Sequence, residues 1–288
     1  MSKVTEIIRY VKLILFPGLF IPKKKKEGED HGIVFSFTTL PSRIQNIKPT
    51  VASLFDQKVR PDKVILNIPR FSKREQRVYK IPHFLKTCPY IQINEIEHDL
   101  GPATKLLPTL KLLKDTETLI VVGDDDEIYP RKLFDNYLNH QFGFKDSVMA
   151  LVGWNAPRDF NHSHKEIRYG AIGSIPKTAS KVEEPTQVDC VQGASTFAVK
   201  SVFFTENVFS YDKAPKEAFF VDDIWVSGHL AQNNIPIYVI PATFRYARMK
   251  VPSHLLFSET LHRKENKSGD NNSTIYRHFQ EEWFSFKR

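Results

Sequence analysis

Three consecutive aspartates, Asp124 to Asp126, are the residues of this sequence whose type and spacing point most directly to chemistry. They follow an apolar run, Leu119 to Val122, that predicts a buried strand. The carboxylates therefore fall at the end of a strand, where ligands collect in open α/β sheets. Adjacent carboxylates repel one another and must be solvated or neutralised, most simply by a divalent cation. The cluster predicts a metal site for a phosphorylated substrate, and an ordinary Asp-rich turn is the alternative.

Strands alternating with helical stretches must position these aspartates. The predicted strands of the first half are Ile33–Phe37, Lys63–Ile68, Ile91–Glu97 and Leu119–Val122. The second half is expected to contain a helix at 131–142, extended segments at 148–152 and 196–199, a helix at 222–231 and a last strand at 237–240. This alternation predicts an α/β fold with a doubly wound, mostly parallel sheet and helices on both faces.

Length and composition are those of a folded soluble protein: 288 residues, 41% hydrophobic and 26% charged. Such a chain can bury a large core, as one α/β domain or as two fused halves. Its two cysteines, Cys88 and Cys190, have no metal-ligand spacing. The sequence therefore predicts a reduced, cytosolic protein without a disulfide framework.

The net charge of +8 is concentrated in residues 1–26, which carry +6, whereas the other 262 residues contribute +2. The body offers no broad phosphate-binding face, which argues against a nucleic-acid partner. The basic segment is amphipathic, but its uninterrupted apolar stretch, Leu13 to Pro22, is shorter than the about 20 residues that span a bilayer. Together with the lysine run from Lys23 to Lys26, it predicts a helix lying on an anionic membrane surface. A helix packed on the protein's own core is the alternative.

Five short motifs follow one another along the chain: Thr38-Thr39 with Arg43 close by, Gly101-Pro102-Ala103-Thr104-Lys105, Asp124-Asp125-Asp126, Gly193-Ala194-Ser195 and Asp222-Asp223-Ile224-Trp225. Each is weak alone, because short aspartate pairs are abundant. In this order and spacing they resemble the GT-A class of nucleotide-sugar glycosyltransferases. The resemblance is to family-2-like enzymes that build surface polysaccharides in bacteria and glycans in large DNA viruses, and it covers roughly residues 32–245. It implies a GT-A (Rossmann-like) fold.

The resemblance also implies a Mg²⁺ or Mn²⁺ cofactor, which would act as a Lewis acid on the departing diphosphate. Asp124 and Asp126 have the Asp-x-Asp spacing and point the same way on extended backbone. Asp126 is then the direct metal ligand, and Asp124 contacts the metal or the ribose. Asp125 is counted with the donor-binding residues, although its side chain is expected to face the other side, toward structure. Some GT-A enzymes use a late histidine as a third ligand, which His254 or His262 would match; surface histidines are the alternative.

The remaining donor-binding residues are expected around the nucleotide and its diphosphate. Lys105 can act as a point charge on the diphosphate or as a donor to the sugar, and a solvated lysine at a helix start is the alternative. The resemblance assigns the base and ribose to Thr38, Thr39 and Arg43, an approach to the nucleotide to Asp99, and the turn that faces the donor to Gly193, Ala194 and Ser195. Ordinary turn chemistry is the alternative for the first three.

An inverting transfer needs a general base to take the proton of the acceptor hydroxyl. Asp223 matches the aspartate of the family's Glu-Asp dyad, and Asp222 stands where glutamate is usual. This departure leaves the base assignment between the two aspartates, and either could instead cap the helix that follows. Trp154 and Trp225 could stack on a sugar or base, although tryptophans are more often core residues.

The sequence thus predicts a metal-dependent, inverting glycosyltransferase that moves a sugar from a nucleotide diphosphate-sugar to a glycan or lipid-linked acceptor at the cytoplasmic face of a membrane. Its expected parts are a membrane-surface arm (1–26), a GT-A catalytic domain (32–250) with a nucleotide-binding half (32–126) and an acceptor half (127–250), and a C-terminal tail (251–288). A nucleotidyltransferase is one rival, although the segment from Thr38 to Arg43 has no glycine-rich loop. A non-catalytic sugar-nucleotide or glycan-binding module is the other, and it needs neither acidic site.

Overall fold

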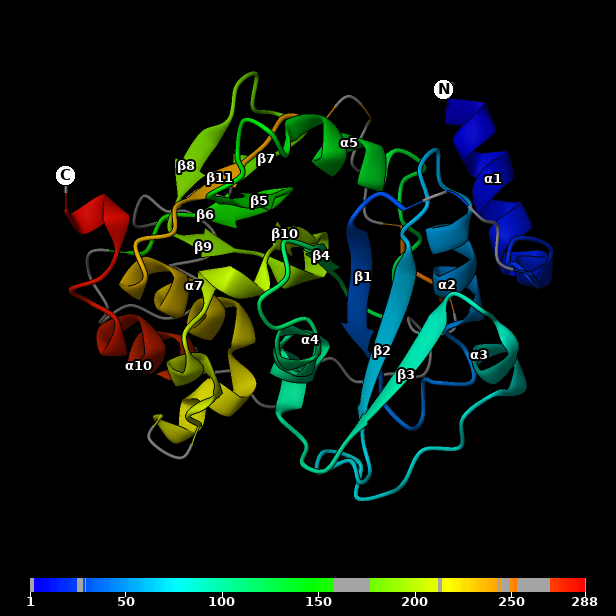
Figure 1. Cartoon of the computed structure of the whole chain (residues 1–288), viewed down its shortest axis with the longest axis horizontal. Helices are drawn as coiled ribbons and strands as arrows, with labels where there is room; N and C mark the ends of the chain where they lie inside the picture. The colour runs from blue at the N-terminus through cyan, green and yellow to red at the C-terminus, as the bar shows by residue number, and fades with distance from the viewer. Residues whose placement is uncertain are drawn as a thin grey trace.

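The computed structural model describes residues 3–24, 28, 30–157, 177–211, 214–242, 244, 249–252 and 270–287. These residues form a mixed α/β architecture around an eight-stranded sheet of order β3-β2-β1-β4-β10-β5-β11-β8, with a second sheet of order β7-β6-β9 (Figure 1). Four of the seven strand pairs in the large sheet are parallel. The predicted α/β class with a mostly parallel central sheet is confirmed.

The first half of the chain supplies four parallel strands: β1 (Ile33–Thr38), β2 (Lys63–Pro69), β3 (Ile91–Ile96) and β4 (Leu119–Val122). All four strands were predicted; β1, β2 and β4 are the largely apolar segments expected of parallel strands covered on both faces, whereas the edge strand β3 alternates apolar and polar residues and is only partly buried. In the β1–β4 pair Ser36 lies opposite Val122. Since the strands run in the same direction, the residues that follow β1 and β4 emerge at the same edge of the sheet.

The second half adds strands of both directions. They are β5 (Val148–Ala150), β6 (Val152–Trp154), β7 (Lys177–Thr178), β8 (Thr186–Val188), β9 (Cys190–Val191), β10 (Phe197–Val199) and β11 (Ile237–Val239). β10 runs antiparallel to both β4 and β5, and β8 runs antiparallel to β11 at the edge. The sequence did not predict β8 or the small sheet, because segments of two or three residues carry no measurable periodicity.

Helices cover both faces of the large sheet (Figure 1). The α-helices are α1 (Lys3–Leu15), α2 (Lys48–Phe55), α3 (His83–Thr87), α4 (Leu107–Leu112), α5 (Leu133–His140), α7 (Asp222–Gln232) and α10 (Asp270–His278). The 3₁₀ turns are η1 (Pro17–Leu19), η2 (Gly101–Lys105), η3 (Gly193–Ser195), η4 (Ser201–Phe203), η5 (Glu206–Phe209), η6 (Lys216–Phe220) and η7 (Phe284–Phe286). None of the helices in the described segments is long and apolar enough to cross a membrane.

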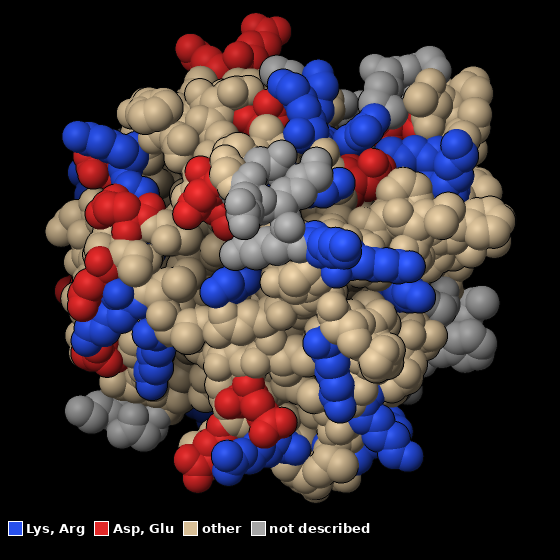
Figure 2. Space-filling model, turned by 45° about the vertical axis from the view of Figure 1, so that its right-hand side comes forward, with Lys and Arg blue, Asp and Glu red and all other residues tan. Residues whose placement is uncertain are grey.

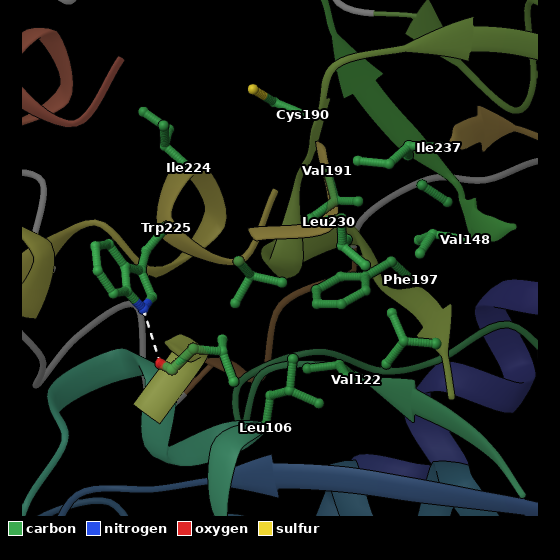
Figure 3. Packing of buried hydrophobic residues seen from close by; sticks show 14 of the residues in the cluster. Leu106, Val122, Val148, Cys190, Val191, Phe197, Ile224, Trp225, Leu230 and Ile237 are labelled. Atoms are coloured by element: carbon green, nitrogen blue, oxygen red, sulfur yellow. Dashed lines mark hydrogen bonds between the residues drawn. The ribbon is translucent and has the colours of Figure 1, made fainter. Parts of the chain in front are cut away.

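Two hydrophobic cores lie on opposite faces of the sheet because successive side chains of a strand point in opposite directions. Phe35 and Phe37 of β1 pack in the core under α2 and α5, whereas Val34 packs in the other core with α4 and α7. Figure 3 shows the second core, in which Leu106 and Val122 face residues of α7.

Trp225 belongs to this second core rather than to a ligand-stacking surface. It is buried in α7, and its indole Nε1 donates a hydrogen bond to the carbonyl oxygen of Val208 at 3.1 Å (Figure 3). Trp154 is partly buried, and its Nε1 donates to the hydroxyl of Tyr276 in α10 at 2.6 Å. α10 thus ties the C-terminal part of the chain to the sheet, and the two tryptophans have structural partners.

Candidate active site

A buried lysine lies where the acidic motifs of the two halves of the chain meet. Lys105, at the end of η2, places its Nζ 2.9 Å from Asp222 Oδ2, 3.2 Å from Asp124 Oδ1 and 4.0 Å from Asp223 Oδ1. Its side chain is 8% exposed, which excludes the alternative of a solvated surface lysine. Two acidic motifs that lie far apart in the sequence therefore converge on one ammonium group.

Opposing effects set the protonation of this lysine. Burial lowers the pKa of Lys105, but the charges of Asp124, Asp222 and Asp223 raise it by more, so the pKa lies well above its ordinary value. The ammonium is therefore charged throughout the physiological pH range. It compensates part of the negative charge that the carboxylates bring into a poorly solvated site.

A network of polar side chains fixes the backbone of Lys105. The hydroxyl of Ser36 on β1 donates to the carbonyl oxygen of Lys105 at 2.6 Å and lies 2.6 Å from the hydroxyl of Thr109. The side-chain amide of Asn67 on β2 donates to both hydroxyls. Because these groups are buried and mutually bonded, they hold η2 against the strand ends.

The predicted glycine turn lies against the same lysine. The backbone N–H of Gly193 donates to Asp223 Oδ1 at 3.0 Å. A Cβ atom at position 193 would lie 2.5 Å from Lys105 Nζ and 2.6 Å from Asp223 Oδ1, closer than real Cβ contacts come. Any larger residue at this position would therefore have to displace the end of the Lys105 or Asp223 side chain. Ala194 is half-buried, and Ser195 is buried with its hydroxyl 3.3 Å from the side-chain oxygen of Gln192.

Asp222 and Asp223 open α7 without capping it. The N-cap position is Val221, and no side chain makes a capping hydrogen bond there, so the helix-cap alternative does not account for the pair. Burial and the charge of Asp222 raise the pKa of Asp223 to about 7, although Lys105 acts in the opposite direction. A quarter of the Asp223 side chain remains exposed. Asp223 is thus an accessible carboxylate whose pKa suits proton uptake near neutral pH.

The middle aspartate of the triplet faces the protein interior, in the direction expected for it. Asp125 is buried, its Oδ2 accepts a hydrogen bond from the hydroxyl of Thr39 at 2.5 Å, and its Oδ1 pairs with Arg43 Nη1 at 3.2 Å. Thr38 donates instead to the carbonyl oxygen of Asn67 at 2.8 Å. Thr39 and Arg43, which were expected to bind the base and ribose, therefore connect the loop after β1 to the turn that contains Asp125.

Asp126 faces a lysine that the sequence did not single out. Lys250 places its Nζ 2.6 Å from Asp126 Oδ1 and 2.9 Å from Glu127 Oε1, and a β-bridge pairs Glu127 with Lys250. The chain distance between the partners is 124 residues, so no local pattern in the sequence could indicate the contact.

Asp99 is placed beside the lysine-bearing turn rather than at an open surface. Its carboxylate accepts the N–H groups of Lys73 and Gly101, each at 2.8 Å. Gly101 has a φ of +62°, a left-handed conformation that glycine adopts without strain. Asp99 therefore stabilises the turn that begins η2 and positions Lys105.

The expected metal can be tested against the donor atoms of the site. The described residues contain no group of three or more His, Cys, Asp and Glu side chains that could hold an ion. Asp124 and Asp126 still provide hard oxygen donors, and Mg²⁺ is commonly held by one or two carboxylates together with substrate phosphates. The site fits a metal that arrives with a diphosphate, in competition with Lys105 and Lys250. His254 and His262 lie outside the described residues.

No protein-family model matches the sequence, and no curated protein matches it either. Among solved structures, that of TarS from S. aureus (residues 1–349) is similar, with a TM-score of 0.40 and 12% sequence identity. The aligned region covers 73% of this chain and 60% of the TarS chain. At this score and identity no residue role is carried over from TarS.

Proposed function

We propose that this protein is a glycosyltransferase that moves a sugar from a nucleotide diphosphate-sugar to an acceptor hydroxyl, with inversion at the anomeric carbon. The observation that carries the proposal is the convergence of Asp124, Asp222 and Asp223 on the buried ammonium of Lys105. Such an arrangement provides a fixed positive charge and a weakly acidic carboxylate a few ångströms apart. A transfer with an anionic leaving group needs both.

In this reaction Asp223 acts as the general base. The acceptor oxygen forms a bond to the anomeric carbon, the bond from that carbon to the diphosphate oxygen breaks, and the electron pair of the broken bond leaves with the diphosphate. The acceptor proton passes to Asp223, whose pKa of about 7 leaves a substantial part of it deprotonated at neutral pH. Attack opposite to the leaving group inverts the configuration of the carbon.

Lys105 stabilises the diphosphate as its negative charge grows. Its ammonium is held in place before the substrate arrives, so the charge needs no reorganisation during the reaction. A Mg²⁺ or Mn²⁺ ion held by Asp126 and Asp124 with the donor diphosphate would supply additional Lewis-acid stabilisation of the leaving group. The acceptor in this proposal is a glycan or a lipid-linked sugar.

Product analysis separates the candidate functions. Nucleotide-sugars are first screened with Mn²⁺ for thermal stabilisation, because a bound ligand raises the apparent stability. With a stabilising donor, sugar transfer releases a nucleoside diphosphate, a nucleotidyltransferase reaction consumes or releases inorganic diphosphate, and a binding module releases neither. We expect nucleoside diphosphate, and inorganic diphosphate or no product would refute the proposal.

Variants then assign the base. Asp223→Asn is expected to lower transfer by about 10²- to 10⁴-fold, the usual contribution of a general base, while donor binding is retained. Asp146→Asn is the matched control, because that side chain is 81% exposed and pairs only weakly with Lys145 at 4.0 Å. If Asp222→Asn loses transfer and Asp223→Asn keeps it, the base is Asp222.

A further inference from the structure

An apolar stripe runs along the outer side of α1. Val4, Ile7, Val11 and Leu15 recur at helical spacing and are 64%, 61%, 44% and 63% exposed. Seven of the twelve large hydrophobic side chains that are exposed in the described part of the chain lie between residues 4 and 19. The surface is completed by Ile8, Phe16 and Leu19. We call these seven residues the α1 stripe.

The opposite side of α1 is anchored to the body of the protein. Arg9 is buried; its Nε pairs with Asp56 Oδ2 at 2.7 Å, and its Nη2 donates to the carbonyl oxygen of Tyr129 at 2.9 Å. Leu13 is fully buried in a small hydrophobic cluster that includes Ile128. The helix is therefore held in a fixed orientation, with its arginine turned inward and its apolar stripe turned outward.

Exposed positive charge lies along the same segment. Lys12 of α1 is exposed, and so are Lys23 and Lys24 after η1. The single acidic residue among residues 1–24 is Glu6, and its carboxylate lies 3.7 Å from Arg9. Figure 2 shows the side of the molecule that carries α1, with lysine and arginine side chains distributed among uncharged residues.

We propose that the α1 stripe docks the protein onto an anionic lipid bilayer, with the helix lying in the plane of the headgroups. A helix of 13 residues is about 20 Å long and cannot cross a hydrocarbon core of about 30 Å, but its apolar side can enter the headgroup boundary. The lysines would then contact anionic headgroups. A second copy of the chain is a less suitable occupant, because face-to-face stripes would bring together two segments that each expose Lys12, Lys23 and Lys24 against the single acidic residue Glu6.

This docking surface does not depend on the proposed transfer reaction, but it would determine where in the cell the reaction takes place. A bilayer held against α1 would place the protein at the surface where lipid-linked acceptors reside. Because vesicle binding is measured without any nucleotide-sugar, its failure and the failure of the transfer assay are distinguishable.

The test is co-sedimentation of the full chain with vesicles of phosphatidylcholine alone or of phosphatidylcholine mixed with phosphatidylserine. We expect strong binding to the mixed vesicles only. The Ile7→Gln, Leu15→Gln double variant is expected to lower the partition coefficient at least about tenfold, because two large side chains lose their transfer into the bilayer. The Lys23→Gln, Lys24→Gln variant should lower the partition coefficient about 25-fold, since each lysine near an anionic surface contributes a factor of about five.

Phe142→Gln is the matched control, because Phe142 is 86% exposed outside the α1 stripe and its loss should leave vesicle binding unchanged. All of these substitutions are at exposed positions, and circular dichroism verifies that the variants are folded. Equal binding of the Ile7→Gln, Leu15→Gln variant and the parent protein overturns the proposal, and so does equal binding to neutral vesicles. The proposal is also overturned if the parent protein does not bind vesicles but forms dimers that the Ile7→Gln, Leu15→Gln variant does not form. That result would assign the α1 stripe to contact with a second copy of the chain.

Discussion

Replacing Asp223 by asparagine should make the protein more stable while it loses transfer activity. The pKa of Asp223 is raised from 3.8 to about 7 by burial and by Asp222, against the opposing effect of Lys105. Between these two pH values the folded state binds more protons than the unfolded state, so the carboxyl group destabilises the fold progressively as the pH rises. Asparagine has nearly the same shape, still accepts the hydrogen bond from Gly193 and does not titrate.

The size of the effect follows from the shift of the pKa. The free energy of unfolding of Asp223→Asn should exceed that of the parent protein by about 2 kcal/mol at pH 5 and by about 4 kcal/mol at pH 8, above which the difference levels off. For a chain of this length the larger value corresponds to a rise in melting temperature of about 10 °C. The gain in the free energy of unfolding is therefore smallest at acidic pH and largest above pH 7.

Thermal and urea unfolding at pH 5, 6, 7 and 8 measure this difference, and the transfer assay is run on the same samples. Asp146→Asn removes an exposed carboxylate and should show no such pH dependence. The reasoning is refuted if Asp223→Asn is no more stable than the parent protein at pH 8, or if its advantage does not grow between pH 5 and pH 8. A more stable variant without transfer activity would identify Asp223 as a group kept at a cost in stability for its function.

Three further perturbations test the surroundings of Asp223. Lys105→Met should lower the free energy of unfolding by about 3–5 kcal/mol, because it leaves buried carboxylates without a positive partner. Urea titration measures this loss, and a value below about 1 kcal/mol would contradict the prediction. Gly193→Ala should change the free energy of unfolding little, because the flexible ends of the neighbouring side chains can move. It should nevertheless lower transfer about 10²-fold, because the new methyl group displaces Lys105. Unchanged steady-state kinetics would refute this prediction. EDTA should abolish transfer, and Lys250→Gln, which frees Asp126, should lower the Mn²⁺ concentration for half-maximal activity about fivefold. Activity that survives chelation, or an unchanged Mn²⁺ requirement in Lys250→Gln, would remove the role assigned to Asp126.

The parts of the fold that the sequence predicts are those whose signal is local. β1, β2 and β4 are largely apolar because both of their faces are buried, whereas the edge strand β3 alternates apolar and polar residues and is only partly buried. α7 is marked by two acidic residues followed by a mostly apolar segment. β8 and the small sheet consist of strands of two or three residues, whose pairing is decided by tertiary contacts. α1 is partly predicted: its amphipathic pattern is visible in the sequence, but the clamp between Arg9 and Asp56 is not.

The same distinction between local signals and distant contacts applies to the residues of the candidate site. Asp124 comes just after β4, so its place at the edge of the sheet could be predicted from the sequence. Lys105 ends the 3₁₀ turn η2 and Asp223 follows the 3₁₀ turn η6, so neither comes directly after a parallel strand, and only the resemblance indicated that they share a site with Asp124. What the sequence does not provide is the partner of each side chain in the turn after β4. Asp125 turns inward to Arg43, and Asp126 turns to Lys250, because the partners were set by loops distant in sequence.

In the proposed transfer reaction, the charge balance at Lys105 would favour a divalent cation in the complex with a donor. One ammonium faces the carboxylates of Asp124, Asp222 and Asp223, so the group is already negative before any substrate binds. A diphosphate adds about two further negative charges next to it, and in a poorly solvated site their repulsion is not screened. Protonation of Asp223 relieves one charge, but a protonated Asp223 cannot act as the base. A Mg²⁺ or Mn²⁺ ion held by Asp124 and Asp126 would relieve two charges and would leave Asp223 free to accept the acceptor proton, so we expect the Mn²⁺ requirement and the pH profile to change together in Lys250→Gln.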